Sequence, residues 1–128
     1  MAARLIRGAP YFPVGDVRAT ASVYERVFGF RVEYMAGEPP VFAICSRDGL
    51  AIMLRRVDDA GRIRPVESQG GTWDAFFWVD DVDALHAELS GRGASVVYGP
   101  VLQEYGVREF AVRDPDGHVL GFGQREGS

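Results

Sequence analysis

The pattern of apolar and polar residues repeats itself at about half the chain length. The segment Tyr11–Val17 is apolar and strand-like and reaches a helix-capping residue at Asp16, and Phe76–Val82 has the same form around Asp81. An Asp side chain at such a place accepts hydrogen bonds from the N–H groups of the first helical turn. The pattern therefore predicts a strand and a capped helix in each half of the chain.

Each predicted helix is followed by β-rich segments. Apolar residues fall close to helical spacing after Asp16 and after Asp81, and Gly29 and Gly91 or Gly93 are natural helix ends. The β-rich segments are Phe30–Tyr34, Val41–Ser46, Leu50–Arg55, Ser95–Tyr98, Val107–Val112 and Val119–Gly123. Tight turns at residues 47–49 and 114–117 join the last two strands of each half. We therefore expect an α+β fold in which the order β-α-β-β-β occurs twice.

The stretch between the repeats, residues 58–71, is polar and rich in glycine, as expected of a linker. We assign residues 5–57 to the first module and 72–125 to the second, within a single domain that spans residues 1–128. A module of about 60 residues buries only a marginal core. The two modules are therefore expected to pack together or to exchange between chains.

Several strands carry large apolar side chains on both faces. If Ala75 and Phe77 face the helices, the two-residue period of a strand places Asp74, Phe76 and Trp78 on the opposite face. Large aromatic residues on both faces indicate that the second face is also covered.

The same alternation places Tyr11 and Met53 on the face away from the helices. An apolar face that carries Tyr11, Met53, Phe76 and Trp78 requires either a ligand or a second subunit. Both alternatives stay open at this point, and they are compatible with each other.

Composition excludes several kinds of chemistry. All 14 basic residues are arginine, so Schiff-base catalysis and a P-loop, which need a lysine, are excluded. The one cysteine, Cys45, lies in an apolar run and is expected to be a buried, inert thiol. With a net charge of −4, no basic stripe and no membrane-length or signal-like apolar segment, we expect a cytoplasmic protein without a nucleic-acid or membrane partner.

Three further polar residues have competing interpretations. His118 follows the turn at residues 114–117 and is expected to stabilise it or to be solvated, and His86 is expected on the surface of the second helix. Either one member of the Arg108–Glu109 pair contacts a ligand, or Arg108 forms an ion pair with Glu104 or Glu109 that stabilises the fold.

Taken together, these motifs resemble the glyoxalase/bleomycin resistance/extradiol dioxygenase superfamily, which has the vicinal oxygen chelate fold. The resemblance is carried by Val14–Val17, Tyr24–Phe30, Val79–Leu85 and Arg108–His118. Residues 106–117 are similar to the Gly-x-Arg-Glu-Phe-x-x-Arg-Asp-Pro-x-Gly run of bleomycin resistance proteins. The resemblance covers nearly the whole chain and implies two βαβββ modules forming a cupped mixed or antiparallel sheet, with the helices on the convex side.

The resemblance also implies where a metal would be held. Enzymes of this superfamily use His, Gln or Glu at four strand positions, which here correspond to Ala9, Met53, Asp74 and Gly121. Only Asp74 could bind a divalent ion, and a catalytic ion needs about three protein ligands. We therefore expect no metal, no cofactor and no catalytic residue.

The function favoured by this resemblance is metal-independent binding and sequestration of a small organic molecule, cationic or aromatic, as in the bleomycin resistance proteins. The candidate ligand-binding residues are Tyr11, Met53, Asp74, Phe76, Trp78 and Arg108. Phe76 and Trp78 would stack on the ligand, and Asp74 would supply a counter-charge. The resemblance implies a homodimer with two binding cups at its interface, often with exchange of an N-terminal segment.

Two alternatives differ in class. One is a metal-dependent glyoxalase-like lyase or dioxygenase with an atypical metal site. The other is an accessory domain whose cup is filled by dimer packing.

Overall fold

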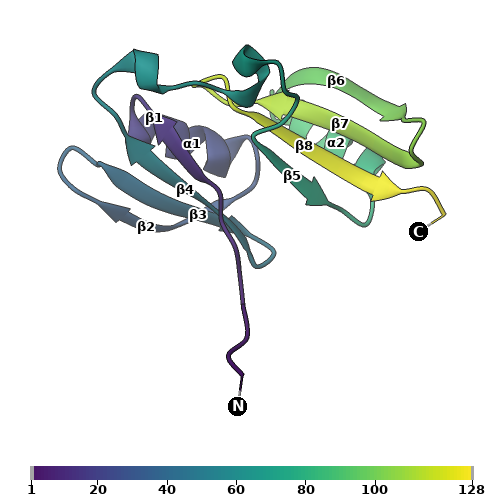
Figure 1. Cartoon of the computed structure of the whole chain (residues 1–128), viewed down its shortest axis with the longest axis horizontal. Coiled ribbons are helices and arrows are strands. Elements are labelled where there is room, and N and C mark those ends of the chain that lie inside the picture. The colour runs from purple at the N-terminus through teal and green to yellow at the C-terminus, as the bar shows by residue number, and fades with distance from the viewer. Residues whose placement is uncertain (1, 128) are drawn as a thin grey trace. The chain divides into compact units, whose positions relative to one another are not determined.

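The sequence repeat forms two four-stranded sheets, each covered on one face by a helix (Figure 1). The computed structural model of the protein describes residues 2–127. The chain divides between Ile63 and Arg64 into two compact units, inside the stretch that was assigned to the linker. That stretch contains two short 3-10 turns, Ala60–Arg62 and Val66–Gln69.

The first unit has the sheet order β1-β4-β3-β2, in which β1 runs parallel to β4 and the other pairs are antiparallel. Its elements are β1 (Tyr11–Val14), α1 (Val17–Arg26), β2 (Arg31–Ala36), β3 (Phe42–Arg47) and β4 (Leu50–Arg56).

The second unit repeats this topology in the order β5-β8-β7-β6, with β5 parallel to β8. Its elements are β5 (Ala75–Trp78), α2 (Val82–Gly91), β6 (Ser95–Leu102), β7 (Val107–Arg113) and β8 (Val119–Arg125). The predicted order β-α-β-β-β is confirmed in both halves.

Both helices begin where the sequence predicts. Asp16 Oδ1 accepts a hydrogen bond from the N–H of Ala19, and Asp81 Oδ1 accepts one from the N–H of Ala84, each at 3.0 Å. Each helix is ten residues long, and among residues 2–127 the structure has no helix with the length and hydropathy needed to cross a membrane.

The core of the second unit lies between its sheet and α2. Phe122 stacks on Phe77 and on Phe110, with ring centroids 5.8 Å and 5.3 Å apart. His86 of α2 meets the Phe110 ring edge-on, and Leu89 of the same helix is fully buried. Burying one side chain of this size stabilises the fold by about 1.5–3 kcal/mol. Phe77 therefore faces the helix as expected, which assigns the opposite face to its neighbours in β5.

Strand β6 is longer than the sequence pattern suggests. The pattern predicts its end at Tyr98, because Gly99 and Pro100 normally interrupt a strand, but β6 continues to Leu102 with a register shift. Gly99 has φ +85°, and a Cβ atom there would lie 2.3 Å from the carbonyl oxygen of Glu109 on β7. The missing side chain lets the two backbones approach, so the strand bends without ending.

We predict that Gly99→Ala lowers the free energy of unfolding by about 2–4 kcal/mol, since it adds a left-handed backbone penalty to a steric clash. Gly91→Ala is the matched control, because Gly91 lies in α2 with open space around its Cβ position. This control is expected to be neutral or to stabilise by up to about 1 kcal/mol. Urea unfolding measures both variants, and equal stability of the two would contradict the close approach at Gly99.

Candidate functional site

In the second unit, the face of the sheet opposite α2 carries a run of aromatic rings. Phe76 and Trp78 pair in parallel register with Gly121 and Gly123 of β8. The ring centroids of Trp73 and Phe76 are 4.7 Å apart, and those of Phe76 and Trp78 are 5.1 Å apart. Trp78 is 57% exposed. The sheet therefore presents a ring system whose outermost member is open to solvent.

Two glycines make room for these rings. A Cβ atom at Gly121 would lie 2.6 Å from ring atoms of both Phe76 and Trp73, and one at Gly123 would lie 2.5 Å from Phe76. Any larger residue at either position would displace the rings. The absence of side chains on β8 thus allows the aromatic residues to lie across it.

A hydrogen-bonded network lies beside the rings. Trp73 Nε1–H donates to the hydroxyl oxygen of Tyr98 at 2.9 Å, and the Tyr98 hydroxyl donates to Glu109 Oε2. Tyr105 donates its hydroxyl proton to Glu109 Oε1 at 2.5 Å. Glu109 is only 1% exposed, so these two tyrosines satisfy a buried carboxylate. We refer to Trp73, Phe76, Trp78, Tyr98 and Tyr105 as the aromatic face.

Both tyrosine hydroxyls are held in their protonated form. Burial and the hydrogen bond to Glu109 raise the pKa of Tyr98 above its ordinary range. The hydrogen bond to Glu109 raises the pKa of Tyr105 to about 12. At neutral pH the network therefore keeps two neutral hydroxyls next to one carboxyl group.

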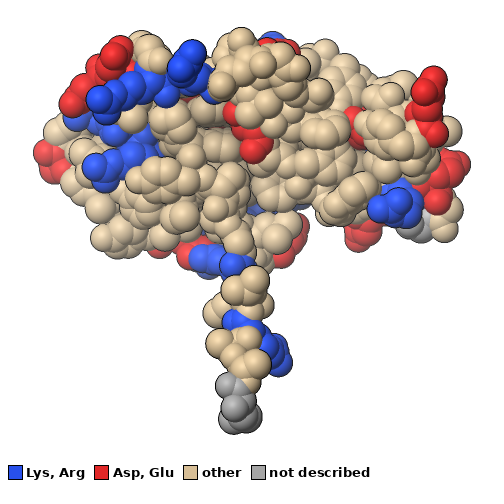
Figure 2. Space-filling view, viewed as in Figure 1, with Lys and Arg blue, Asp and Glu red and all other residues tan. Residues whose placement is uncertain are grey.

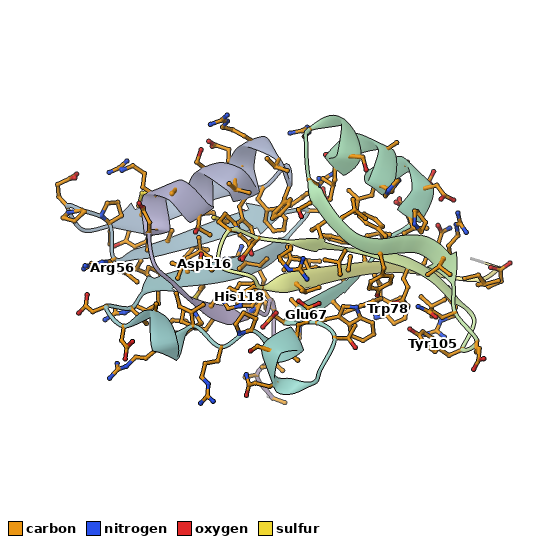
Figure 3. The ribbon with its side chains drawn as sticks, turned by 90° about the horizontal axis from the view of Figure 1, so that it is seen from above. Arg56, Glu67, Trp78, Tyr105, Asp116 and His118 are labelled. Atoms are coloured by element: carbon orange, nitrogen blue, oxygen red, sulfur yellow. The ribbon has the colours of Figure 1, made fainter. Side chains whose placement is uncertain are left out.

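A cation already lies against the exposed end of the aromatic face. The guanidinium carbon of Arg125 lies 5.0 Å from the centroid of the Trp78 ring. Figure 3 shows Trp78 and Tyr105 at the same end of the second unit, on the side away from α2. In Figure 2 the surface over this sheet is mostly uncharged. The ring faces, and not a cluster of charges, thus dominate what this surface offers to a ligand.

Asp74, the predicted counter-charge for a ligand, makes its hydrogen bonds within the chain. Its Oδ2 accepts the N–H of Val119 at 2.7 Å, and its Oδ1 accepts the N–H of Val66 at 3.0 Å. The same Oδ1 lies 3.3 Å from His118 Nδ1, and the side chain is 8% exposed. Both carboxylate oxygens are therefore used to join the 3-10 turn at 66–69 to the start of β8.

Arg108, another predicted ligand-binding residue, forms an ion pair with helix α2. Its Nε and Nη2 bind the carboxylate of Asp83 on α2 at 2.9–3.2 Å, so its partner is neither Glu104 nor Glu109. Adjacent residues of a strand point to opposite faces, which separates Arg108 from Glu109. The ion pair lowers the pKa of Asp83 and joins β7 to the helix.

In the first unit, the structure brings Tyr11 and Met53 together as register partners of β1 and β4. The Tyr11 ring lies 6.5 Å from Phe42, which lies 6.2 Å from Tyr34. The four predicted residues Tyr11, Met53, Phe76 and Trp78 are thus divided between two sheets, with one neighbouring pair in each unit.

The remaining polar candidates have structural surroundings. His118 is buried, and its backbone N–H donates to Asp114 Oδ1 at 2.9 Å. It therefore stabilises the turn that it follows and is not solvated. His86 packs against Phe110 on the helix side of the sheet. Cys45 is buried, and desolvation raises the pKa of its thiol to about 11.

The residues at the four positions implied for a metal do not fit one. Both carboxylate oxygens of Asp74 accept hydrogen bonds from backbone N–H groups. Two aromatic rings fill the space that a larger side chain at position 121 would need. Ala9 has no donor, and the Met53 thioether is a poor ligand for hard divalent ions. Among residues 2–127 no three His, Cys, Asp or Glu side chains are grouped to hold an ion.

The candidate ligand-binding residues predicted from the sequence do not include five residues of this site, namely Trp73, Tyr98, Tyr105, Glu109 and Arg125. One signal was present: Glu109 alternates with the core residue Phe110, which places it on the face away from α2. Nothing local identifies Tyr98, because its position depends on the register shift in β6.

Comparison with known proteins gives one family match and many similar structures. The model of the Glyoxalase/Bleomycin resistance protein/Dioxygenase superfamily matches residues 8–122. No curated protein matches the sequence.

Three solved structures illustrate the similarity. TioX from Micromonospora sp. ML1 is 26% identical with a TM-score of 0.74, over 93% of this chain and 98% of that chain. TnmS3, an antibiotic binding protein from Streptomyces sp. CB03234, is 28% identical with a TM-score of 0.70, over 98% and 99%. The bleomycin-binding protein of bleomycin-producing Streptomyces verticillus, complexed with copper(II)-bleomycin, is 24% identical with a TM-score of 0.69, over 99% and 100%, and shares the fold.

We predict that Tyr98→Phe lowers the free energy of unfolding by about 1–3 kcal/mol, because Glu109 and the Trp73 indole each lose a buried partner. Tyr34→Phe is the control, since Tyr34 occupies the corresponding place in β2 and is 54% exposed. Its effect should stay within about 0.5 kcal/mol. Denaturant unfolding compares the two, and equal losses would contradict the network.

Proposed function

The chain belongs to the glyoxalase/bleomycin resistance protein/dioxygenase superfamily, and on that premise we propose that it binds a small organic molecule of aromatic or cationic character. Binding takes place on the aromatic face of the second unit and withholds the molecule from its target without altering it. The similarity to TnmS3, which is an antibiotic binding protein, supports this function.

The observation that carries the proposal is the exposed Trp78 ring with a cation against it. A flat ligand gains area and ring contacts by stacking on Trp78 beside Phe76. A cation over a Trp ring contributes about 0.5–1 kcal/mol at an exposed site and about 2 kcal/mol when desolvated. Arg125 already makes such a contact from within the chain. The same face is therefore suited to an aromatic or cationic group of a ligand.

The polar groups of the second unit favour binding without chemical change, because they are hydrogen-bonded to other groups of the chain. Asp74 holds backbone N–H groups, His118 lies beside it, and Glu109 holds two tyrosines. A general base must reach a substrate proton with an available lone pair and a suitable pKa. None of these three residues has an arrangement directed at a substrate.

We propose in addition that the protein acts in the cytoplasm as a homodimer. Each unit holds about 60 residues and has an apolar face opposite its helix, which suits burial against a second copy. Light scattering on the purified protein gives the mass directly. A mass of one chain at micromolar concentration would contradict the dimer and leave the binding proposal standing.

We predict that bleomycin quenches the tryptophan fluorescence saturably and is recovered unchanged by mass spectrometry. Trp78→Ala should weaken its affinity about tenfold or more, because the stacking partner is lost. Tyr34→Ala is the control for loss of an exposed aromatic ring on the other unit, at a residue outside the candidate ligand-binding set. No saturable binding of bleomycin or related antibiotics, equal affinity of Trp78→Ala, or a stoichiometric metal in protein purified without chelator would contradict this function.

We predict that Arg125→Ala tightens binding of a cationic ligand about two- to fivefold, since the side chain competes for the Trp78 ring with an energy of about 0.5–1 kcal/mol. Arg92→Ala is the control, because Arg92 pairs with Glu88 on α2, on the other side of the sheet. Calorimetric titration of both variants measures the change. Weaker binding in Arg125→Ala would show that this residue assists the ligand and does not compete with it.

A further inference from the structure

The direction of each hydrogen bond at Glu109 is fixed by its neighbours. The indole N–H of Trp73 can only donate, so the oxygen of Tyr98 accepts from it and the single proton of Tyr98 points to Glu109. The hydroxyl of Tyr105 donates to the other carboxylate oxygen. Both tyrosine protons are therefore committed to one buried group.

Tyr105 consequently shows the solvent only an acceptor. The residue is 60% exposed, and its one hydroxyl proton is directed inward to Glu109. The outward lone pairs of its oxygen can accept a hydrogen bond, but the hydroxyl has no second proton to offer.

The position of Tyr105 relative to Trp78 follows from the sheet register. Trp78 and Glu109 are both register partners of Gly123, from opposite sides of β8. Two strand spacings separate their backbones, which is about 10 Å. The Phe76 ring fills the space above Gly123, so the floor between the two ends is apolar. A ring stacked on Trp78 can thus direct a polar group toward the Tyr105 oxygen.

We propose that Glu109 is a specificity-determining residue, which makes the Tyr105 hydroxyl an acceptor and so selects ligands that carry a hydrogen-bond donor, above all an ammonium group, against carboxylates and phosphates. This inference rests on the proposed function, because it concerns the same aromatic face. The buried carboxylate adds a negative potential that favours a cation and repels an anion. An anionic group placed at Tyr105 would also find no proton there, while the Arg125 guanidinium lies against the Trp78 ring at the other end of the face.

The test uses three probes that share one ring and differ in one group: 1-naphthylmethylamine, 1-naphthylmethanol and 1-naphthylacetate, each titrated by calorimetry at pH 7. The wild type should prefer the ammonium probe to the carboxylate probe by about tenfold or more, since a hydrogen bond to a charged group is strong. Binding of the three probes without this preference would overturn the inference and leave the proposed function standing. Absence of binding by all three, and by bleomycin, would overturn both.

The matched variants are Glu109→Gln and Glu104→Gln. A glutamine at 109 keeps the shape but has one acceptor oxygen and an N–H₂ group, so the amide donates to Tyr105 and turns its proton outward. The preference for ammonium should fall to about threefold or less in Glu109→Gln. Glu104→Gln removes the same charge from an exposed position of the turn before β7 and should keep the preference. Equal effects of both variants would overturn the inference in favour of general charge.

A measurement without ligand tests the network itself. The absorbance of tyrosinate is measured against pH as the difference between each protein and its Tyr105→Phe form. Tyr105 should ionise at a higher pH in the wild type than in Glu109→Gln, where its pKa returns toward about 10. An unchanged titration in Glu109→Gln would show that Glu109 does not hold the Tyr105 proton, and would overturn the inference even if the probes bind.

Discussion

A carboxylate with 1% exposure must find hydrogen-bond donors, because an unsatisfied buried charge would cost several kcal/mol. Glu109 finds them in Tyr98 and Tyr105, and Tyr98 in turn accepts from Trp73. Each of these bonds fixes an aromatic ring in one orientation. The position of Phe76 follows, since its ring packs between the two tryptophans over the glycines of β8. One buried group thus determines what the surface of the second unit presents.

The two units have the same topology but different side chains on the sheet face opposite the helix. Register places Met53, Arg55 and Phe42 of the first unit where the second unit has Gly121, Gly123 and Glu109. Tyr34 and Tyr98 correspond, and each follows a register shift in its strand. Glycines and a carboxylate occur together only at the three positions of the second unit. This is why Phe76 can occupy the space over β8 and why Tyr98 is hydrogen-bonded to Glu109.

Much of the fold could be predicted from the sequence because it depends on local chemistry. The caps at Asp16 and Asp81 need one residue each, and the two-residue period assigned Phe76 and Phe77 to opposite faces correctly. The roles of Asp74 and Arg108 could not be predicted in this way. Asp74 binds an N–H that is 45 residues away, and the partner of Arg108 lies on a helix 25 residues earlier. Sequence proximity suggested Glu104 or Glu109 as that partner, but the alternation of the strand directs Arg108 and Glu109 to opposite faces.

Stacking of a ligand on Trp78 can be observed directly, because the chain has two tryptophans. Each indole N–H gives one signal in a ¹H–¹⁵N NMR spectrum, and Trp78→Phe assigns them. On titration with bleomycin or 1-naphthylmethylamine, the Trp78 signal should move to saturation, while the Trp73 signal, which is hydrogen-bonded to Tyr98, should move much less. Saturable binding that leaves the Trp78 signal unmoved would contradict the account.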